Sequence, residues 1–407
     1  MKIGIVVTHP PKESMGSIVR VREFSRNLSK MNHEVHVISP FSFNENWGEN
    51  VFFHQIKTFT GGSAFSEKMY SIARKILNVP YLSRLIMLRE RTIRKIINSL
   101  SFSIYDFITS CKMELDIIQG EQEIAAAALV SIKEKLKIPV IADIHNIWPE
   151  ELIVMGIIKR HDKRYNVLMS IESEIMSGAD CIISVSNFMY DYLTKSFDVD
   201  KSKIHIVEPG GTLRREEPKE RSKNPSAVYA GLVAYREHVD LFVKSMPYVL
   251  KRVPQAEFYI TKKGEHLGKI QKLAKEINVS PHFFWIPNEN EFFEFLASFY
   301  VGVVPSTKDL PRKMGTPVKL FDYMSVGIPV VANDIGSWSE IIRKENIGLL
   351  TEDDPKDFAD AISYFLDDPD KSYKYGKRCI ELIKNKYNWK FSTEKLIEVY
   401  KSILTKY

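Results

Sequence analysis

Short runs of β-branched and apolar residues alternate along this chain with longer amphipathic stretches, and this alternation restricts the possible folds more than any other feature. We expect strands at residues 3–7, 35–39, 116–119, 140–143, 182–185, 227–231, 258–261, 283–286, 301–304 and 330–332. Strands that alternate with helices form parallel sheets. The pattern therefore predicts an α/β protein of the doubly wound type, with its strands divided between two sheets.

The length of the chain and the composition near its middle indicate two domains. At 407 residues, the chain is roughly two to three times the size of a usual domain. Residues 209–224 have the composition of a linker: a proline and two glycines are followed by a strongly charged stretch. We therefore expect an N-terminal domain at residues 1–208 and a second domain at residues 209–387.

Composition excludes several classes of protein. With 44% hydrophobic and 27% charged residues, the chain is too apolar to be disordered, and its net charge of +6 is too small to indicate nucleic acid binding. Cys111, Cys181 and Cys379 form no C-x-x-C pair, so we expect neither a disulfide framework nor a structural zinc site. The longest apolar run, residues 124–130, is shorter than the roughly 18 residues that span a membrane. Residues 1–7 are typical of a first strand and not of a signal peptide, so we expect a cytoplasmic protein.

Residues 316–332 carry the most specific motif, T-P-V-K-L-F-D-Y-M-S-V-G-I-P-V-V-A. A loop with a proline leads into a short helix that bears Asp322, Gly327 ends this helix, and Pro329 precedes a buried strand. The loop presents backbone N–H groups at the positive end of the helix, which suits an anionic or hydroxyl-rich ligand. The alternative interpretation is an ordinary helix-to-strand turn.

This motif resembles the donor-site signature of the family-4 glycosyltransferases of GT-B fold, in the variant K-L-F-E-Y-M-A-x-G-x-P-V-V. The residues that agree are Lys319, Leu320, Phe321, Tyr323, Met324, Gly327, Pro329, Val330 and Val331. Further similar segments are residues 203–211, 227–231, 301–306, 387–389 and 398–404. The resemblance implies two Rossmann-like doubly wound domains that face each other across a cleft. It also implies that residues 388–407 return to the first domain, which would bind the acceptor.

The resemblance assigns donor-binding roles to residues of the second domain. Asp322 would bind the ribose of a nucleotide sugar, because a carboxylate can accept hydrogen bonds from two neighbouring hydroxyls. The strand end at Gly231 would face the diphosphate. Where the family often has a second acid, this chain has Met314. Contacts to the donor sugar would therefore come from backbone N–H groups near Gly315 and Thr316.

Two departures concern the diphosphate. The family usually neutralises it with an Arg and a Lys, and Leu232 and Glu237 stand at those positions here. Because a leaving diphosphate needs cationic or N–H stabilisation where no metal supplies it, we expect a replacement. Arg236 is the first candidate and Lys319 the second. The alternative is that either is only a surface charge.

In the first domain, His145 is the candidate catalytic residue, and the loop after the first strand is the candidate acceptor-side segment. His145 follows a predicted strand, at the sheet edge where open α/β sheets bind ligands. A histidine there can donate a hydrogen bond to a sugar hydroxyl, and the family's D-x-H segment implies a catalytic place near the transferred sugar. The alternative is a structural loop histidine. The loop resembles the family's acceptor-side loop through Gly16, which precedes Ser17, and it lacks the G-x-G-x-x-G of a dinucleotide-dependent dehydrogenase.

A basic stretch suggests a membrane contact. Residues 67–100 contain eight basic and two acidic residues. On a helical wheel Arg84, Arg91, Arg94 and Lys95 lie opposite an apolar stripe. Such a helix can bind an anionic membrane surface, which would place the protein at the inner face of the membrane. The alternative is a helix whose stripe packs on the sheet and whose cations face water.

Together these observations predict a retaining, metal-independent glycosyltransferase. Its co-substrate would be a nucleotide diphosphate sugar, with no other cofactor. Its acceptor would be a glycan or a lipid-linked molecule. Two alternatives stay open: an inactive relative that serves as a binding or regulatory partner, and a sugar-nucleotide epimerase of the same architecture.

Overall fold

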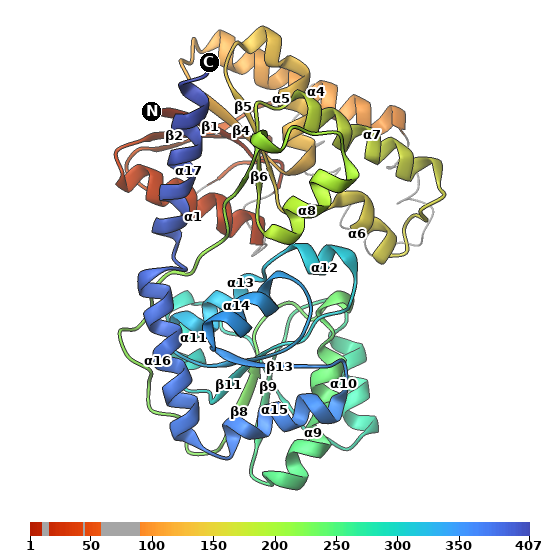
Figure 1. Ribbon diagram of the computed structural model, residues 1–407, viewed down its shortest axis with the longest axis vertical. Helices are drawn as coiled ribbons and strands as arrows, with labels where there is room; N and C mark the ends of the chain where they lie inside the picture. The colour runs from red at the N-terminus through yellow and green to blue at the C-terminus, as the bar shows by residue number, and fades with distance from the viewer. Residues whose placement is uncertain (10–15, 44, 58–89) are drawn as a thin grey trace. The chain divides into compact units, whose positions relative to one another are not determined.

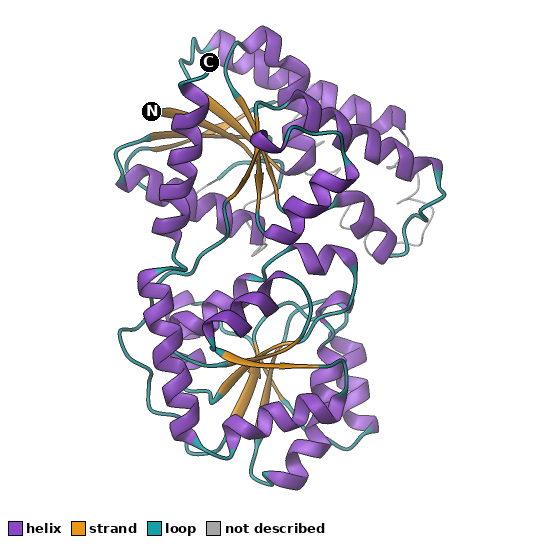
Figure 2. Cartoon of the chain, viewed as in Figure 1, coloured by secondary structure: helices purple, strands orange, loops and turns teal. Residues whose placement is uncertain are grey.

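The computed structural model describes residues 1–9, 16–43, 45–57 and 90–407. The chain divides into two compact units. The first consists of Met1–Glu208 and Ser392–Tyr407, and the second of Pro209–Phe391. Each unit has a central sheet with helices on both faces (Figures 1 and 2). Every strand pairing between the described elements is parallel, so the expectation of a doubly wound α/β fold is confirmed.

The sheet of the first unit has the order β3-β2-β1-β4-β5-β6-β7. Its strands are β1 (Lys2–Val6), β2 (Glu34–Ser39), β3 (Val51–Gln55), β4 (Ile117–Glu121), β5 (Val140–Ile144), β6 (Cys181–Ser184) and β7 (Ile204–Ile206). Its described helices are α1 (Gly16–Lys30), α4 (Glu90–Ser110), α5 (Gln122–Leu136), α6 (Trp148–Val154), α7 (Lys163–Gly178), α8 (Asn187–Ser196) and the 3-10 turn η1 (Lys201–Lys203). The last helix, α17 (Trp389–Leu404), contributes its residues from Ser392 onward to this unit.

The sheet of the second unit has the order β10-β9-β8-β11-β12-β13. Its strands are β8 (Ser226–Tyr229), β9 (Glu257–Thr261), β10 (His282–Phe284), β11 (Val301–Val304), β12 (Val330–Asn333) and β13 (Gly348–Thr351). Its helices are α9 (Val239–Arg252), α10 (Leu267–Glu276), α11 (Glu289–Leu296), α12 (Leu310–Met314), α13 (Val318–Ser325), α14 (Ser337–Glu345), α15 (Pro355–Leu366), α16 (Pro369–Asn385) and the 3-10 turn η2 (Tyr235–Glu237).

The strands of the second unit are apolar on both faces because helices cover both. Successive side chains of a strand point to opposite faces. Ala227 and Tyr229 of β8 accordingly join the core under α9 and α15, which pack against each other. Val228 and Ala230 join the opposite core, formed with α13, α14 and α16. Burial on both faces is what makes such strands continuous apolar runs in the sequence.

The strand orders locate where each sheet can bind a ligand. In open α/β sheets, ligands bind beyond the carboxyl ends of the strands, where the strand order reverses. In the first unit this point lies between β1 and β4, and in the second between β8 and β11. The candidate residues are therefore those that follow these four strands.

All ten strands expected from the sequence are present, with ends shifted by at most two residues. β3, β7 and β13 were not expected from the pattern. All three are edge strands, and β7 has only three residues. β3 ends on the polar pair His54-Gln55, and β13 has only four residues and begins with glycine, so neither forms a long β-branched run. Among the described residues, no helix is long and apolar enough to cross a membrane.

Candidate functional site

Helix α13 is held against the switch point of the second sheet by one tyrosine. The backbone N–H of Ala230, just after β8, donates to the hydroxyl of Tyr323 over 2.8 Å. The same hydroxyl lies 3.3 Å from the carbonyl oxygens of Val228 and Val303, so it can donate to either neighbouring strand. Gly302 in β11 makes room for the ring, since a Cβ there would lie 2.6 Å from Tyr323. These contacts set the position of α13 relative to the strand ends.

Three charged side chains meet beside this helix. Glu237, at the end of η2, forms ion pairs with both Arg312 of α12 and Lys319 of α13. Nε of Arg312 also donates to the hydroxyl of Ser306, which follows β11, over 3.1 Å. Nζ of Lys319 donates to the hydroxyl of Tyr229 over 3.0 Å and lies above its ring. The charged cluster Glu237–Arg312–Lys319 thus lies at the carboxyl ends of β8 and β11.

The charges of this cluster stabilise one another. Burial by itself would raise the pKa of Glu237, but Lys319 and Arg312 outweigh burial and lower this pKa to about 2. Burial lowers the pKa of Lys319, and Glu237 opposes that shift. With one carboxylate and two cations, the cluster keeps a net positive charge. That charge suits an anion.

Other predicted donor-site residues lie nearby. Asp322 is three residues after Lys319, on the same face of α13, and is partly exposed. A Cβ at Gly231 would lie 2.9 Å from Nζ of Lys319, so the glycine leaves room for the ammonium group. A Cβ at Gly315 would meet no atom of the described residues within 4 Å. The hydroxyl of Thr316 lies 2.9 Å from that of Ser337.

Met314 lies in the core, whereas Arg236, the first candidate to bind the diphosphate, lies in the turn η2. Met314 is buried, in keeping with its apolar side chain. Arg236 lies in η2 next to Glu237, where its charge helps to lower the pKa of that carboxyl group. Its backbone carbonyl accepts hydrogen bonds from Thr307 and Arg312. Leu232 is 41% exposed and contributes no charge.

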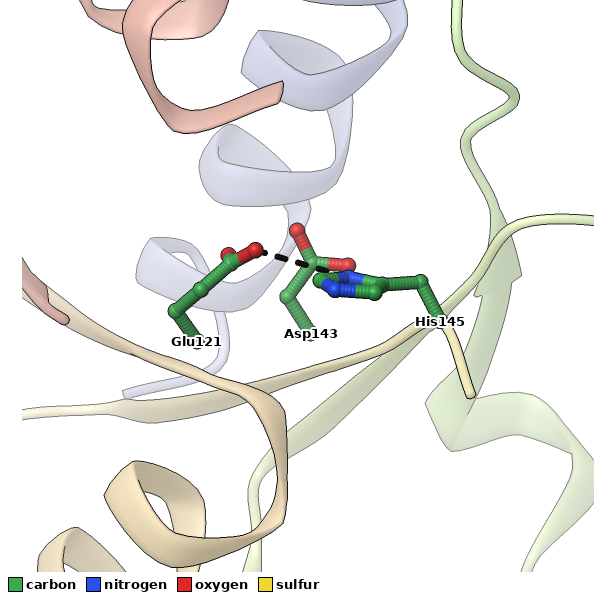
Figure 3. A group of neighbouring side chains, drawn as sticks. All are labelled: Glu121, Asp143 and His145. Carbon is green, nitrogen blue, oxygen red and sulfur yellow. Dashed lines mark ion pairs between the residues drawn. The ribbon is translucent and has the colours of Figure 1, made fainter. Parts of the chain in front are cut away.

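In the first unit, β4 and β5 bring three polar side chains together (Figure 3). Glu121 and Asp143 are direct neighbours in the register of these strands, and His145 follows two residues later. Asp143 accepts from Nε and Nη2 of Arg20 over 2.9 and 3.1 Å and from Nε2 of Gln119 over 3.1 Å. The Asp143 carboxylate is therefore fully engaged and its charge is balanced by a buried arginine.

His145 contacts a protein group at each ring nitrogen. Nδ1 lies 3.4 Å from Oε1 of Glu121, and Nε2 lies 2.7 Å from the amide nitrogen of Gln122. Gln122 in turn contacts Nε2 of His9, in the loop after β1. Burial lowers the pKa of His145 to about 4, so this histidine is neutral. A sugar hydroxyl that used Nε2 would have to displace the Gln122 amide.

Glu121, Asp143 and His145 offer ligand atoms within 4.8 Å of one another, a spacing that a metal ion would need. However, Arg20 and Gln119 already donate to both oxygens of Asp143, and a guanidinium group repels a cation. The arrangement fits a hydrogen-bond network better than a metal site.

The acceptor-side candidates lie at the beginning of α1. Gly16 is its first residue, and Ser17 follows with a buried hydroxyl that has no hydrogen-bonding partner among the described residues. Arg20, which binds Asp143, lies one turn later on the same helix.

Two family models match most of this chain. The model of Glycosyltransferase Family 4 matches residues 16–215, and that of Glycosyl transferases group 1 matches residues 224–368. The chain belongs to the family-4 glycosyltransferases. The family resemblance of the K-L-F-D-Y-M motif is thereby confirmed.

Curated relatives of this chain are distant in sequence. The D-inositol 3-phosphate glycosyltransferase of Nocardia farcinica is 24% identical over 255 residues, which are 57% of this chain and 55% of the relative. A GDP-mannose-dependent alpha-(1-6)-phosphatidylinositol monomannoside mannosyltransferase of Mycobacterium tuberculosis is 22% identical over 248 residues, which are 57% of this chain and 64% of the relative. The chain thus matches little more than half the length of these proteins.

Solved structures agree over the whole chain. Sucrose-phosphate synthase from Thermosynechococcus elongatus has a TM-score of 0.77 at 18% identity and covers 100% of both chains. The Anabaena protein HepE in complex with UDP-glucose has a TM-score of 0.70 at 11% identity, with 99% of this chain and 100% of that chain covered. At these identities the likeness shows the fold, and it confirms the GT-B class.

Three residues near the candidate site were not predicted from the sequence: Arg312, Glu121 and Gln122. Arg312 follows strand β11 by eight residues, and the segment Asp309-Leu310-Pro311-Arg312 carries an N-cap and a proline that predict a short helix at the sheet edge. That signal was available. Glu121 and Gln122 carried no signal, because their role depends on the contact with His145.

The basic stretch is described only in part. Arg84 lies outside the described residues. Arg91 and Lys95 are exposed on α4, whereas Arg94 binds Glu174 of α7 through two hydrogen bonds of 2.5 and 2.6 Å. Ile93, Ile97 and Leu100 of the apolar stripe are buried. In this part of the chain the stripe belongs to the core, as the alternative interpretation expects, and Arg94 is already paired.

Proposed function

We propose that this protein transfers a sugar from a nucleotide diphosphate sugar to a hydroxyl group of an acceptor. The observation that carries the proposal is the charged cluster Glu237–Arg312–Lys319 at the switch point of the second sheet. Leu232 and Glu237 stand at the two positions where the family usually has cations. Arg312 of α12 and Lys319 of α13 place two cations at the same strand ends.

In this proposal the diphosphate binds Arg312 and Lys319. Both side chains can donate to phosphate oxygens, and stabilisation of the leaving diphosphate by fixed cations lowers the barrier to its departure. Glu237 holds the two cations at their places. Asp322, on the exposed side of α13, accepts from the ribose hydroxyls. Solved structures of HepE with UDP-glucose and with UDP support a nucleotide sugar as the donor.

The finer features of the reaction are part of the proposal. Retention of anomeric configuration and independence of metal ions follow from the family resemblance. A lipid-linked or glycan acceptor is supported by the relative named as a phosphatidylinositol monomannoside mannosyltransferase. An inner-face membrane location would suit a lipid-linked acceptor and the exposed Arg91 and Lys95.

Nucleotide binding tests the donor site. Thermal shift and calorimetry with UDP, GDP and ADP should identify one nucleoside diphosphate that stabilises the wild type, because a ligand of the native state raises its stability. Arg312→Ala and Lys319→Ala should each weaken its affinity by about 10- to 100-fold, the scale of a hydrogen bond between charged groups. Lys313→Ala, an exposed lysine next to Arg312 on α12, is the matched control and should bind normally.

Turnover separates the proposal from its alternatives. Each nucleotide sugar is incubated with membrane extract as a source of acceptors. A transferred sugar supports the proposal. An isomerised donor would favour the epimerase, and binding without any product would favour the inactive partner. Unchanged affinity in both Arg312→Ala and Lys319→Ala would remove these residues from the diphosphate site.

The membrane contact has its own test. Wild-type protein should sediment with vesicles that contain anionic lipid, and Arg91→Glu with Lys95→Glu should release it, since each cation near such a surface contributes about 1 kcal/mol. Arg94→Glu is not included, because Arg94 pairs with Glu174. If wild type stays in solution even at low salt, a water-soluble acceptor is favoured.

A further inference from the structure

Glu121 is a buried acid whose carboxyl group faces His145. It ends β4, is 0% exposed, and neither of its oxygens has a hydrogen-bonding partner in the part of the chain that the structure describes. Oε1 of Glu121 faces Nδ1 of His145 at a distance of 3.4 Å (Figure 3). Nδ1 likewise has no hydrogen-bonding partner among the described residues. One proton between these two atoms would satisfy both of them.

The surrounding charges decide whether Glu121 is ionised. The titratable groups that face it come from five places: Arg20 of α1, Glu123 of α5, Asp143 of β5, His145 after β5 and Tyr400 of α17. Arg20 is the cation among them. It donates through Nε and Nη2 to Asp143 and makes no hydrogen bond to Glu121. An ionised Glu121 would therefore be a surplus buried charge beside two other acids, which is strongly unfavourable.

Two hydrogen-bond arrangements are possible around the imidazole ring. If Glu121 is ionised, Nδ1–H donates to it and Nε2 accepts from the Gln122 NH₂ group. If Glu121 is neutral, its O–H donates to Nδ1, and Nε2–H donates to the Gln122 oxygen. A half-turn of the Gln122 amide exchanges its oxygen and nitrogen, so Gln122 fits both arrangements. In the structure the Gln122 nitrogen lies 2.7 Å from Nε2 of His145 and the Gln122 oxygen contacts Nε2 of His9, as in the first arrangement. The second arrangement turns the amide, so its NH₂ group then donates to Nε2 of His9; the oxygen and nitrogen of an amide are told apart only by such partners.

We propose that Glu121 is a positioning residue for His145: its neutral carboxyl group donates to Nδ1 and holds the imidazole ring as the tautomer with N–H at Nε2. Burial and Asp143 together raise the pKa of Glu121 well above its usual value, in agreement with this arrangement. The ring then presents a donor on the side of Gln122, where the ionised arrangement would present an acceptor. The inference rests on the proposed function in one respect only: Nε2–H of His145 would donate a hydrogen bond to a sugar hydroxyl.

Infrared spectroscopy tests the state of Glu121 without any substrate. At pH 7 the wild-type spectrum minus that of Glu121→Gln should contain one protonated carboxyl band that shifts in D₂O. Glu123→Gln is the matched control. Glu123 is also buried and has a raised pKa, so this variant should lose a different carboxyl band and keep that of Glu121. Loss of an ionised carboxylate band in Glu121→Gln would overturn the proposal.

Nitrogen NMR of labelled histidine tests the tautomer. The His145 signals are assigned by their loss in His145→Gln. Wild type should show N–H at Nε2, and Glu121→Gln should keep it, because its amide can still donate to Nδ1. Glu121→Met, which cannot donate, should give a mixture of both tautomers. A wild-type ring with N–H at Nδ1 would overturn the proposal, and this result does not depend on whether the Met variant folds.

Kinetics connect the tautomer with turnover. If a donor and acceptor are found, Glu121→Met should lower kcat by tenfold or more with little change in the donor KM, and Glu121→Gln should restore kcat. Equal kcat in wild type and a folded Glu121→Met would show that the tautomer is not used. If no sugar is transferred at all, the proposed function fails, while the two spectroscopic results still decide the role of Glu121.

Discussion

At the scale of single residues, Glu237 stands where the family resemblance implies a lysine, and it pairs with two cations from other elements. Its carboxylate lies between Arg312 and Lys319 and keeps both at the strand ends. The side chain of Glu237 is 14% exposed, so the two ion pairs are only weakly screened by solvent. The carboxylate and its two partners therefore have to be considered as one unit.

Removal of this carboxylate should destabilise the second unit. Glu237→Gln leaves two partly buried cations without their partner, and we expect the free energy of unfolding to fall by about 2–4 kcal/mol. Urea unfolding measures the loss. The control is Glu352→Gln, whose pair with Lys308 is exposed and should contribute less than about 1 kcal/mol. Equal small losses in both variants would contradict the structural role of Glu237.

Glu123 gives the first unit a dependence on pH. Burial raises the pKa of Glu123 from 4.5 to about 8. Between these values the unfolded chain has lost this proton and the folded chain has kept it, so stability falls as pH rises from about 4.5 to 8. Glu123→Gln cannot ionise, and its amide oxygen can still accept from the backbone.

We expect Glu123→Gln to be more stable than wild type by about 3–5 kcal/mol at pH 8 and nearly equal to it at pH 4, since the pKa rises from 4.5 to about 8 and each pKa unit corresponds to about 1.4 kcal/mol. Thermal unfolding across this range is the measurement. Glu134→Gln, an exposed acid on the same helix, should follow wild type. A Glu123→Gln curve parallel to that of wild type would show that Glu123 is ionised in the folded protein.

At the scale of elements, the position of α13 depends on the close approach of its tyrosine to β11. Gly302 permits this approach, and the Tyr323 hydroxyl then accepts from Ala230 at the end of β8. Lys319 and Asp322 are carried by the same helix. A substitution in the buried strand β11 should therefore alter nucleotide binding at the candidate donor site.

Gly302→Ala should destabilise the protein by about 1–3 kcal/mol, because its Cβ would lie 2.6 Å from the Tyr323 ring. It should also weaken nucleotide binding, since the ring and α13 must shift. Gly268→Ala in α10 is the control: within the part of the chain that the structure describes, its Cβ meets nothing within 4 Å, and we expect it to be neutral or stabilising by up to about 1 kcal/mol. Denaturant unfolding and calorimetry measure both effects. Normal affinity in Gly302→Ala would mean that α13 does not depend on this contact.

At the scale of the whole molecule, most of the last helix, α17, belongs to the first unit. Residues from Ser392 onward belong to the first unit, where Leu396 and Tyr400 are fully buried. The Tyr400 hydroxyl donates to Gln119 over 2.6 Å, and Gln119 donates to Asp143. The last helix is thus connected by hydrogen bonds to the network that includes Arg20.

Tyr400→Phe should destabilise the first unit selectively. It leaves a buried acceptor on Gln119 without its donor, at a cost of about 1–3 kcal/mol. Hydrogen exchange resolved by peptide should show faster exchange in β4 and β5 and no change in the sheet of the second unit. Tyr407→Phe, at an exposed tyrosine, should behave as wild type. Faster exchange in both units would contradict the separation into two cores.

The sequence by itself determined the fold class, ten of the strands and the family, because these depend on local patterns: β-branched runs between amphipathic stretches, and one contiguous motif around Asp322. Only the tertiary structure decided the partners of those residues. Arg312 meets Glu237 across 75 positions of the chain, and Glu121 meets His145 only because β4 and β5 are neighbours in the sheet. The protonation of a buried group depends on which charges surround it, and the packing of distant segments decides that.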